Sequence, residues 1–180
     1  MKTIFVLCGP GGVGKSKIAK EVAKQTNLTF VKAYTTRERR KDDKDYNFVT
    51  KKEFLQFVEN NEMAEYNLFC NEYYGRKIDD FKTALSKKDS CISIIDPLSI
   101  KEIKNIKFFS DKNIVTIFID ANDNNLKDRL QNRGEKSEVI DFKLKNSKIE
   151  RKNKSFCDFA INNDNFEDCA NKIVQIIKSF

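Results

Sequence analysis

The sequence contains no histidine, and this absence excludes several kinds of active site. Catalytic triads built on histidine, zinc sites of the HExxH type and imidazole general bases are all removed from consideration. The chain is also poor in proline (two) and glycine (six), and neither a repeat nor a Pro/Ser-rich linker divides it. Because 180 residues are enough for one compact α/β core but awkward for two, a single domain over residues 1–180 is expected.

The five cysteines are scattered, and long apolar runs are absent. No C-x-x-C pair occurs, which argues against a zinc ribbon or a disulfide framework and indicates reduced thiols. No apolar run approaches the roughly 18 residues that a membrane-spanning helix needs. The glycine-rich opening is unlike a signal peptide. We therefore expect a cytoplasmic protein without membrane contact.

A net charge of +7 admits nucleic acid, an anionic membrane or a polyanionic small molecule as partner. Most lysines alternate with acidic residues, as is typical of exposed helix faces. A nucleic-acid-binding ATPase remains an alternative, and its signature would be salt-sensitive DNA binding. We expect small-molecule substrates and no nucleic acid.

Short apolar runs alternate with helical patterns along most of the chain. Four runs predict buried strands, at residues 3–8, 90–95, 113–119 and 156–161. Six segments show helical spacing of apolar residues, at 16–25, 51–60, 77–86, 124–132, 137–153 and 165–180. This order predicts an α/β fold with a parallel sheet flanked by helices, of the P-loop NTPase type. The aromatic-rich segment 30–75 breaks the alternation and is interpreted as an inserted substrate-binding region, in which the charged loop 41–45 connects two short strands.

The strongest motif is GPGGVGKS, a complete G-x-x-x-x-G-K-S between a predicted strand and a predicted helix. Glycines allow backbone N–H groups to point at phosphate oxygens, and the N-terminus of the next helix adds positive potential. Lys15 is expected to reach the β- and γ-phosphates, and Ser16 to bind Mg²⁺. The motif predicts ATP or GTP binding by these residues: Gly9, Gly11, Gly12, Val13, Gly14, Lys15 and Ser16. Since no N-K-x-D motif occurs and the chain is short for a motor, a small kinase is favoured.

The segment AYTTRERRKDDKDYNF, starting at Ala33, resembles the acceptor-binding region of guanylate kinases, and the resemblance continues through FVTKKEFLQFVENNEMAEYNLFCNEYYG. It implies a helical lid at about 124–153, an acceptor-binding α+β insertion at about 33–76 and a core of about 1–32, 77–123 and 154–180. By motif position it implies that the acceptor's phosphate is held by Arg37, Arg40, Tyr46 and Tyr74. Arginine and tyrosine suit this task, because they offer permanent charge and hydroxyls at fixed positions.

The same resemblance supplies residues for the base and for the lid. It places Glu65 where a carboxylate accepts hydrogen bonds from N1 and N2 of guanine, and Asp96 near the acceptor. Asp96 also follows a predicted buried strand, where α/β sheets place their sites, although it could equally cap a turn. The segment DRLQNRGEKSEVIDFKL resembles the lid, which makes Arg129 and Arg133 candidates for closing over the phosphates.

Some positions depart from the family pattern. Ala33 stands where a serine usually helps to read O6 of guanine, and Arg76 replaces a small hydroxyl residue with a similar task. Arg76 could donate to O6 or fold outward. Ile94 replaces an acidic residue and Lys143 an arginine, a change that loses the bidentate fork.

The implied reaction is the transfer of the γ-phosphoryl group from Mg-ATP to GMP, with dGMP also accepted, in a monomer or homodimer. No general base is needed, because the second pKa of a phosphate monoester is about 6. Two alternatives remain open: a kinase for another nucleoside monophosphate, and a guanylate-kinase-like module that binds phosphopeptides. The intact phosphate loop argues against the second.

Overall fold

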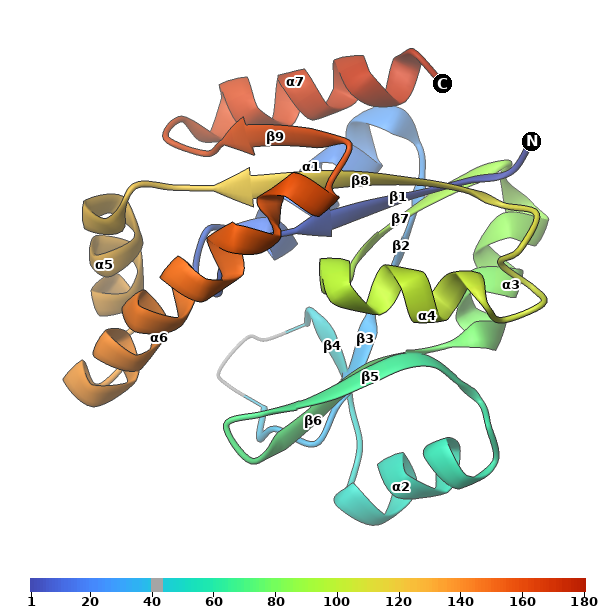
Figure 1. Cartoon of the computed structure of the whole chain (residues 1–180), viewed down its shortest axis with the longest axis horizontal. Helices are drawn as coiled ribbons and strands as arrows, with labels where there is room; N and C mark the ends of the chain where they lie inside the picture. The colour runs from blue at the N-terminus through green and yellow to red at the C-terminus, as the bar shows by residue number, and fades with distance from the viewer. Residues whose placement is uncertain (40–43) are drawn as a thin grey trace.

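Figure 1 shows the fold in a computed structural model that describes residues 1–39 and 44–180. The main sheet has five parallel strands in the order β2-β7-β1-β8-β9. They span Thr29–Val31 (β2), Ser90–Ile94 (β7), Thr3–Cys8 (β1), Asn113–Asp120 (β8) and Phe159–Asn162 (β9). All six residues of β1 are buried, because this central strand is covered on both faces. The predicted α/β fold with a parallel sheet is confirmed.

Helices cover both faces of this sheet. One face packs against α1 (Lys15–Thr26), α5 (Asp123–Asn132) and α7 (Phe166–Lys178), and the other against α3 (Ile78–Lys87) and α4 (Ile100–Lys104). Alternate residues of β1 supply the two cores: Phe5 and Leu7 face the first set of helices, and Ile4 and Val6 face the second. The apolar run of β1 is thus a strand that serves two cores at once.

A second, four-stranded sheet has the order β4-β3-β6-β5. It is formed by Ala33–Thr35 (β3), Tyr46–Phe48 (β4), Met63–Phe69 (β5) and Glu72–Lys77 (β6), with β3 and β4 parallel and the other pairs antiparallel. Helix α2 (Lys51–Glu59) starts with a capping box between Thr50 and Glu53 and buries Phe54, whose ring stacks on Tyr73 at 5.3 Å. An aromatic core thus joins α2 to this sheet.

Helix α6 (Ser137–Glu150) lies with α5 at the end of the main sheet toward which β8 and β9 point, while the second sheet and α2 lie below the main sheet (Figure 1). The predicted boundaries were wrong here, since α6 ends at Glu150 and a 3₁₀ segment covers Arg151–Phe156. The last strand begins only at Phe159, because Asp158 accepts hydrogen bonds from the backbone N–H and hydroxyl of Thr116, both at 2.7 Å. Within the described residues, no helix combines the length and the apolar character needed to cross a membrane.

Candidate active site

The phosphate-binding motif forms the loop between β1 and α1. Gly9 and Gly14 have φ values of 126° and 98°, in the region that favours glycine. A side chain at Gly9 would collide with the backbone carbonyl of Ile119. Val13 is fully buried and anchors the loop in the core, and Lys15 and Ser16 open α1. The N-terminus of this 12-residue helix therefore faces the space in front of the loop, a favourable place for an anion.

The ammonium of Lys15 is held by its own loop. Nζ donates to the carbonyl oxygen of Gly9 and, at 2.8 Å, to that of Pro10. Burial lowers the pKa of Lys15, while the negative charges of Glu150 and Asp96 act in the opposite direction and the positive charge of Arg133 adds to the lowering. These four charged groups thus share one neighbourhood.

Arg129 lies against the phosphate loop. Its guanidinium donates to the carbonyl oxygen of Val13 at 3.2 Å and to that of Asn163 at 2.6 Å. The buried side chain of Asn163 donates to the same Val13 oxygen at 2.7 Å. Arg133 caps the C-terminus of α5 and is exposed. The two predicted lid arginines therefore differ, since one is bonded to the loop and the other is exposed.

Three of the four predicted phosphate-gripping residues come together on the second sheet. The guanidinium carbon of Arg37 lies 5.4 Å from the ring centre of Tyr46, whose ring lies 5.8 Å from that of Tyr74. The fourth, Arg40, is outside the described residues. Arg39, which the sequence analysis did not single out, lies 4.7 Å above the ring of Phe48. A cation and two phenols are thus gathered at one end of this sheet.

Glu65 and Arg76 form a buried ion pair. Nη1 of Arg76 donates to Oε1 of Glu65 at 2.7 Å, and the two residues are 8% and 6% exposed. Burial raises the pKa of Glu65, and the charge and hydrogen bond of Arg76 oppose this shift. Arg76 thus folds inward onto the predicted base-reading carboxylate, rather than outward into solvent.

Asp96 caps the 3₁₀ turn Pro97–Ser99, with Oδ1 accepting from the N–H of Leu98 at 2.9 Å. The predicted turn-capping role is therefore present. Burial lowers the pKa of Lys15 and raises that of Glu65, and the negative charge of the exposed Asp96 carboxylate is a lesser influence that acts upward on both. Asp96 therefore lies close enough to influence the phosphate loop and the ion pair of the second sheet together.

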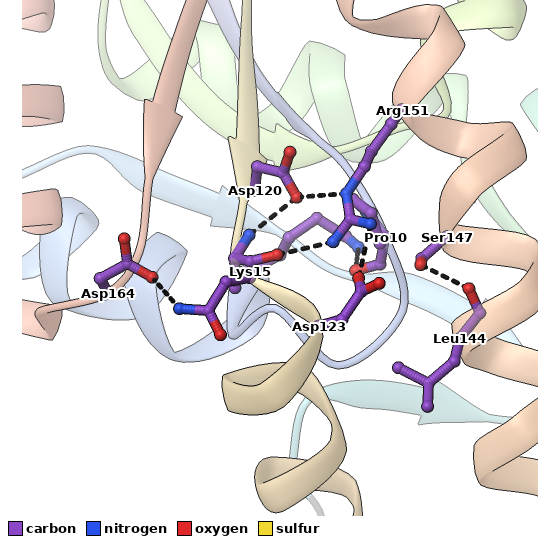
Figure 2. Close-up of polar contacts among 10 residues, drawn as sticks. Pro10, Lys15, Asp120, Asp123, Leu144, Ser147, Arg151 and Asp164 are labelled. Atoms are coloured by element: carbon purple, nitrogen blue, oxygen red, sulfur yellow. Dashed lines mark hydrogen bonds and ion pairs between the residues drawn. The ribbon is translucent and has the colours of Figure 1, made fainter.

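Arg151, directly after α6, was missed by the sequence analysis. Figure 2 shows its guanidinium between two carboxylates, bonded to Asp120 at 2.9 Å and Asp123 at 2.6 Å, and it also donates to the carbonyl of Ala121 at 2.7 Å. Asp120 ends β8, so the strand-end argument that selected Asp96 would have found it too. Lys143, on α6, forms an ion pair at 2.5 Å with Glu135, which lies just before that helix.

Ser16 is the candidate metal ligand, and it lies next to Lys15 in the first turn of α1. Among the residues described, no cluster of three His, Cys, Asp or Glu side chains is arranged to hold a metal ion. The single hydroxyl of Ser16 fits a Mg²⁺ ion that arrives with a nucleotide, because Mg²⁺ usually takes most of its ligands from phosphates and water.

Comparison with known proteins agrees with this geometry. A sequence profile described as guanylate kinase matches residues 1–180. A guanylate kinase of Mesomycoplasma hyopneumoniae is 34% identical over 188 residues, covering 98% of this chain and 94% of the relative. A guanylate kinase of Thermotoga maritima is 33% identical over 182 residues, covering 98% and 86%.

A solved structure supports the same assignment. The crystal structure of guanylate kinase from Anaplasma phagocytophilum superimposes with a TM-score of 0.77 at 25% identity, covering 99% of this chain and 85% of that chain. The phosphate loop, the second sheet and the whole-length match therefore lead to one conclusion: the chain belongs to the guanylate kinase family.

Proposed function

We propose that this protein transfers the γ-phosphoryl group of ATP to GMP, and to dGMP, and releases ADP and the nucleoside diphosphate. The observation that carries the proposal is the presence in one chain of a complete phosphate loop at the N-terminus of α1 and of a second sheet that gathers Arg37, Tyr46 and Tyr74. A site for a phosphate donor and a site for a phosphate acceptor are the two parts that a phosphotransferase needs. Relatives named guanylate kinase, matched over nearly their whole length, support the same activity.

ATP binds at the phosphate loop. The backbone N–H groups of Gly9–Ser16 and the N-terminus of α1 surround the phosphates, and Lys15 bonds the β- and γ-phosphates. To do so, its ammonium exchanges the carbonyl oxygens of Gly9 and Pro10 for phosphate oxygens. Bound Mg²⁺, with Ser16 as its protein ligand, would neutralise charge on the phosphates.

GMP binds on the second sheet. Arg37, Tyr46 and Tyr74 are already gathered there and hold its phosphate, and Arg40 is predicted to join them. A permanently charged fork and two hydroxyls suit a phosphate dianion. Glu65 accepts hydrogen bonds from N1 and N2 of guanine, and Asp96 lies near the acceptor. A base without these donors leaves the buried carboxylate unpaired, which disfavours its binding.

The chemistry needs positioning and charge. A phosphate oxygen of GMP attacks the γ-phosphorus in line, and the leaving ADP carries away the bonding electron pair. Lys15, Arg37, Arg129 and Arg133 supply positive charge around the transferring group. We assign residues 124–153 as a lid that closes over the nucleotides and excludes water, residues 33–76 as the acceptor-binding part and the rest as the core.

A coupled assay of ADP release tests the proposal, with Mg-ATP and a panel of GMP, dGMP, AMP, CMP, UMP and dTMP. We expect turnover with GMP and dGMP only, and none with Lys15→Met. A different preferred monophosphate would show that the acceptor pocket serves another base. ATP binding without phosphorylation of any acceptor would overturn the kinase assignment.

A further inference from the structure

Three residues form a row across the second sheet. Glu65 on β5 lies opposite Arg76 on β6 in the antiparallel register. Between β3 and β6, Tyr34 lies opposite Gly75 and Thr35 opposite Tyr74, so one further step places Ala33 opposite Arg76. Residues opposite each other in neighbouring strands direct their side chains to the same face of a sheet. Ala33, Arg76 and Glu65 thus share one face.

The backbone fixes the position of the pair. The register between β5 and β6 shifts between Met63 and Glu65, the sign of a bulge, which re-aims the side chain that follows it. A Cβ atom on Gly75 would lie 2.6 Å from the carbonyl oxygen of Glu65 and 2.7 Å from Cβ of Tyr66. Only glycine therefore allows the strands to approach this closely beside Arg76.

The donors of Arg76 are only partly matched. One terminal nitrogen bonds one oxygen of Glu65, while the buried Nε has no hydrogen-bond partner among the described residues. A guanidinium carries five N–H donors in a rigid fork. Ala33, 2% exposed, supplies neither a donor nor bulk next to it. A buried arginine with spare donors beside a small residue is suited to bind a further acceptor group.

Guanine presents the matching pattern on one edge. Its O6 is an acceptor, N1–H and the 2-amino group next to it are donors, and arginine pairs with O6 and N7 of guanine in the commonest specific contact to this base. An arginine beside a carboxylate offers donors to O6 and acceptors to N1–H and the 2-amino group. Adenine presents an amino group in place of O6, so it would meet the arginine donor to donor.

We propose that Arg76 is a specificity-determining residue that donates to O6 of the guanine base, while the adjacent Glu65 accepts from N1–H and the 2-amino group. The inference rests on the proposed GMP kinase activity and adds a residue to it. Before the base binds, Arg76 pairs with Glu65 and so keeps this buried carboxylate from being unpaired.

The test uses acceptors that differ along the recognised edge of the base: GMP, IMP, which lacks the 2-amino group, and 2-aminopurine riboside monophosphate, which lacks O6 and, with it, the hydrogen on N1. We expect Arg76→Met to lower kcat/KM for GMP and IMP by about 10- to 100-fold, the effect of one charged hydrogen bond. The 2-aminopurine nucleotide, with no O6 to lose, should fall far less. The KM for ATP should stay unchanged.

Two further variants make the result decisive. Arg76→Lys keeps a cation next to Glu65, so the ratio of GMP to 2-aminopurine activity can be measured even if Arg76→Met fails to fold. Lys77→Met removes a cation from the same strand, where Lys77 pairs with Glu62 at a more exposed site, and should leave that ratio at the wild-type value.

An equal loss on all three acceptors in the Arg76 variants would overturn the inference, because it would mean that Arg76 only holds Glu65 in place. A wild-type protein that phosphorylates none of them would instead overturn the proposed function. Calorimetric binding of GMP and the 2-aminopurine nucleotide to wild type and Arg76→Met would then decide the role of Arg76.

Discussion

The side chain of Arg129 is bonded to the backbone of Val13, with its guanidinium 3.2 Å from the carbonyl oxygen. Asn163 donates to the same oxygen at 2.7 Å. These partners are 116 and 150 residues away along the chain, on α5 and directly after β9. The shape of the phosphate loop therefore depends on contacts from two distant elements as well as on its glycines.

Replacement of Asn163 by alanine should loosen the phosphate loop. The Val13 oxygen would lose a buried hydrogen bond, at a cost of about 1–2 kcal/mol, which lowers Tm by roughly 2–8 °C in a chain of this size. We also expect a higher KM for ATP and an unchanged KM for GMP. Scanning calorimetry and steady-state kinetics measure these effects. Asn162→Ala, at an exposed position of β9, is the control and should change neither Tm nor the KM for ATP.

The glycines of the loop should differ in their tolerance of substitution. Gly9→Ala places a side chain against the backbone of Ile119 at a φ of 126°, and we expect it to cost at least about 2–3 kcal/mol in the free energy of unfolding. A side chain at Gly11 meets no atom within 4 Å, so Gly11→Ala should stay within about 0.5 kcal/mol of wild type. Urea unfolding compares them, and equal stabilities would contradict the loop geometry.

Lys15 should give the protein a particular dependence of stability on pH. Its pKa is lowered in the folded protein, mainly by burial, so between that pKa and 10.5 the folded state binds fewer protons than the unfolded state. The free energy of unfolding should therefore increase as the pH rises through this window. Lys15→Met lacks this gain, and its stability relative to wild type should fall as pH rises.

Urea titrations of both proteins from pH 7 to pH 10 test this, since a constant difference would show that Lys15 does not titrate as described. In the phosphotransfer assay, we expect Lys15→Met to lose activity by at least about 10²–10³-fold, because it removes a charge aimed at the transferring group.

Arg151 should stabilise the junction between β8 and the end of α6. Arg151→Gln loses two ion pairs and weakens the bond to the Ala121 carbonyl, and we expect a loss of about 1–2 kcal/mol. Arg151→Lys should recover less than half, because lysine cannot span three acceptors. As a control, Lys82→Gln breaks an exposed pair with Asp79 and should cost less than about 0.5 kcal/mol. Chemical denaturation ranks the three variants.

Several predictions from the sequence stay predictions. These are the division into core, insertion and lid, the binding of Mg²⁺, the cytoplasmic location and a monomeric or homodimeric state. The roles of the individual site residues also await the experiments above, and the part played by Arg40 lies outside the described residues.

The sequence by itself determined the features whose causes are local. The strand 3–8, the loop Gly9–Ser16 and the helix after it were predicted closely, because apolar periodicity and glycine spacing act between near neighbours. The motif resemblance also led to Glu65 and Arg76 as a base-reading neighbourhood.

Only the tertiary structure decided what those residues contact. The strand Thr29–Val31 was missed because its three residues are stabilised by pairing with β7, about 60 positions away along the chain. The bonds of Arg129 to the loop and of Arg151 to two carboxylates likewise join distant segments. Arg76 was left between two orientations by the sequence, and the register of β5 with β6 turned it onto Glu65, because a buried carboxylate is stable only beside a partner.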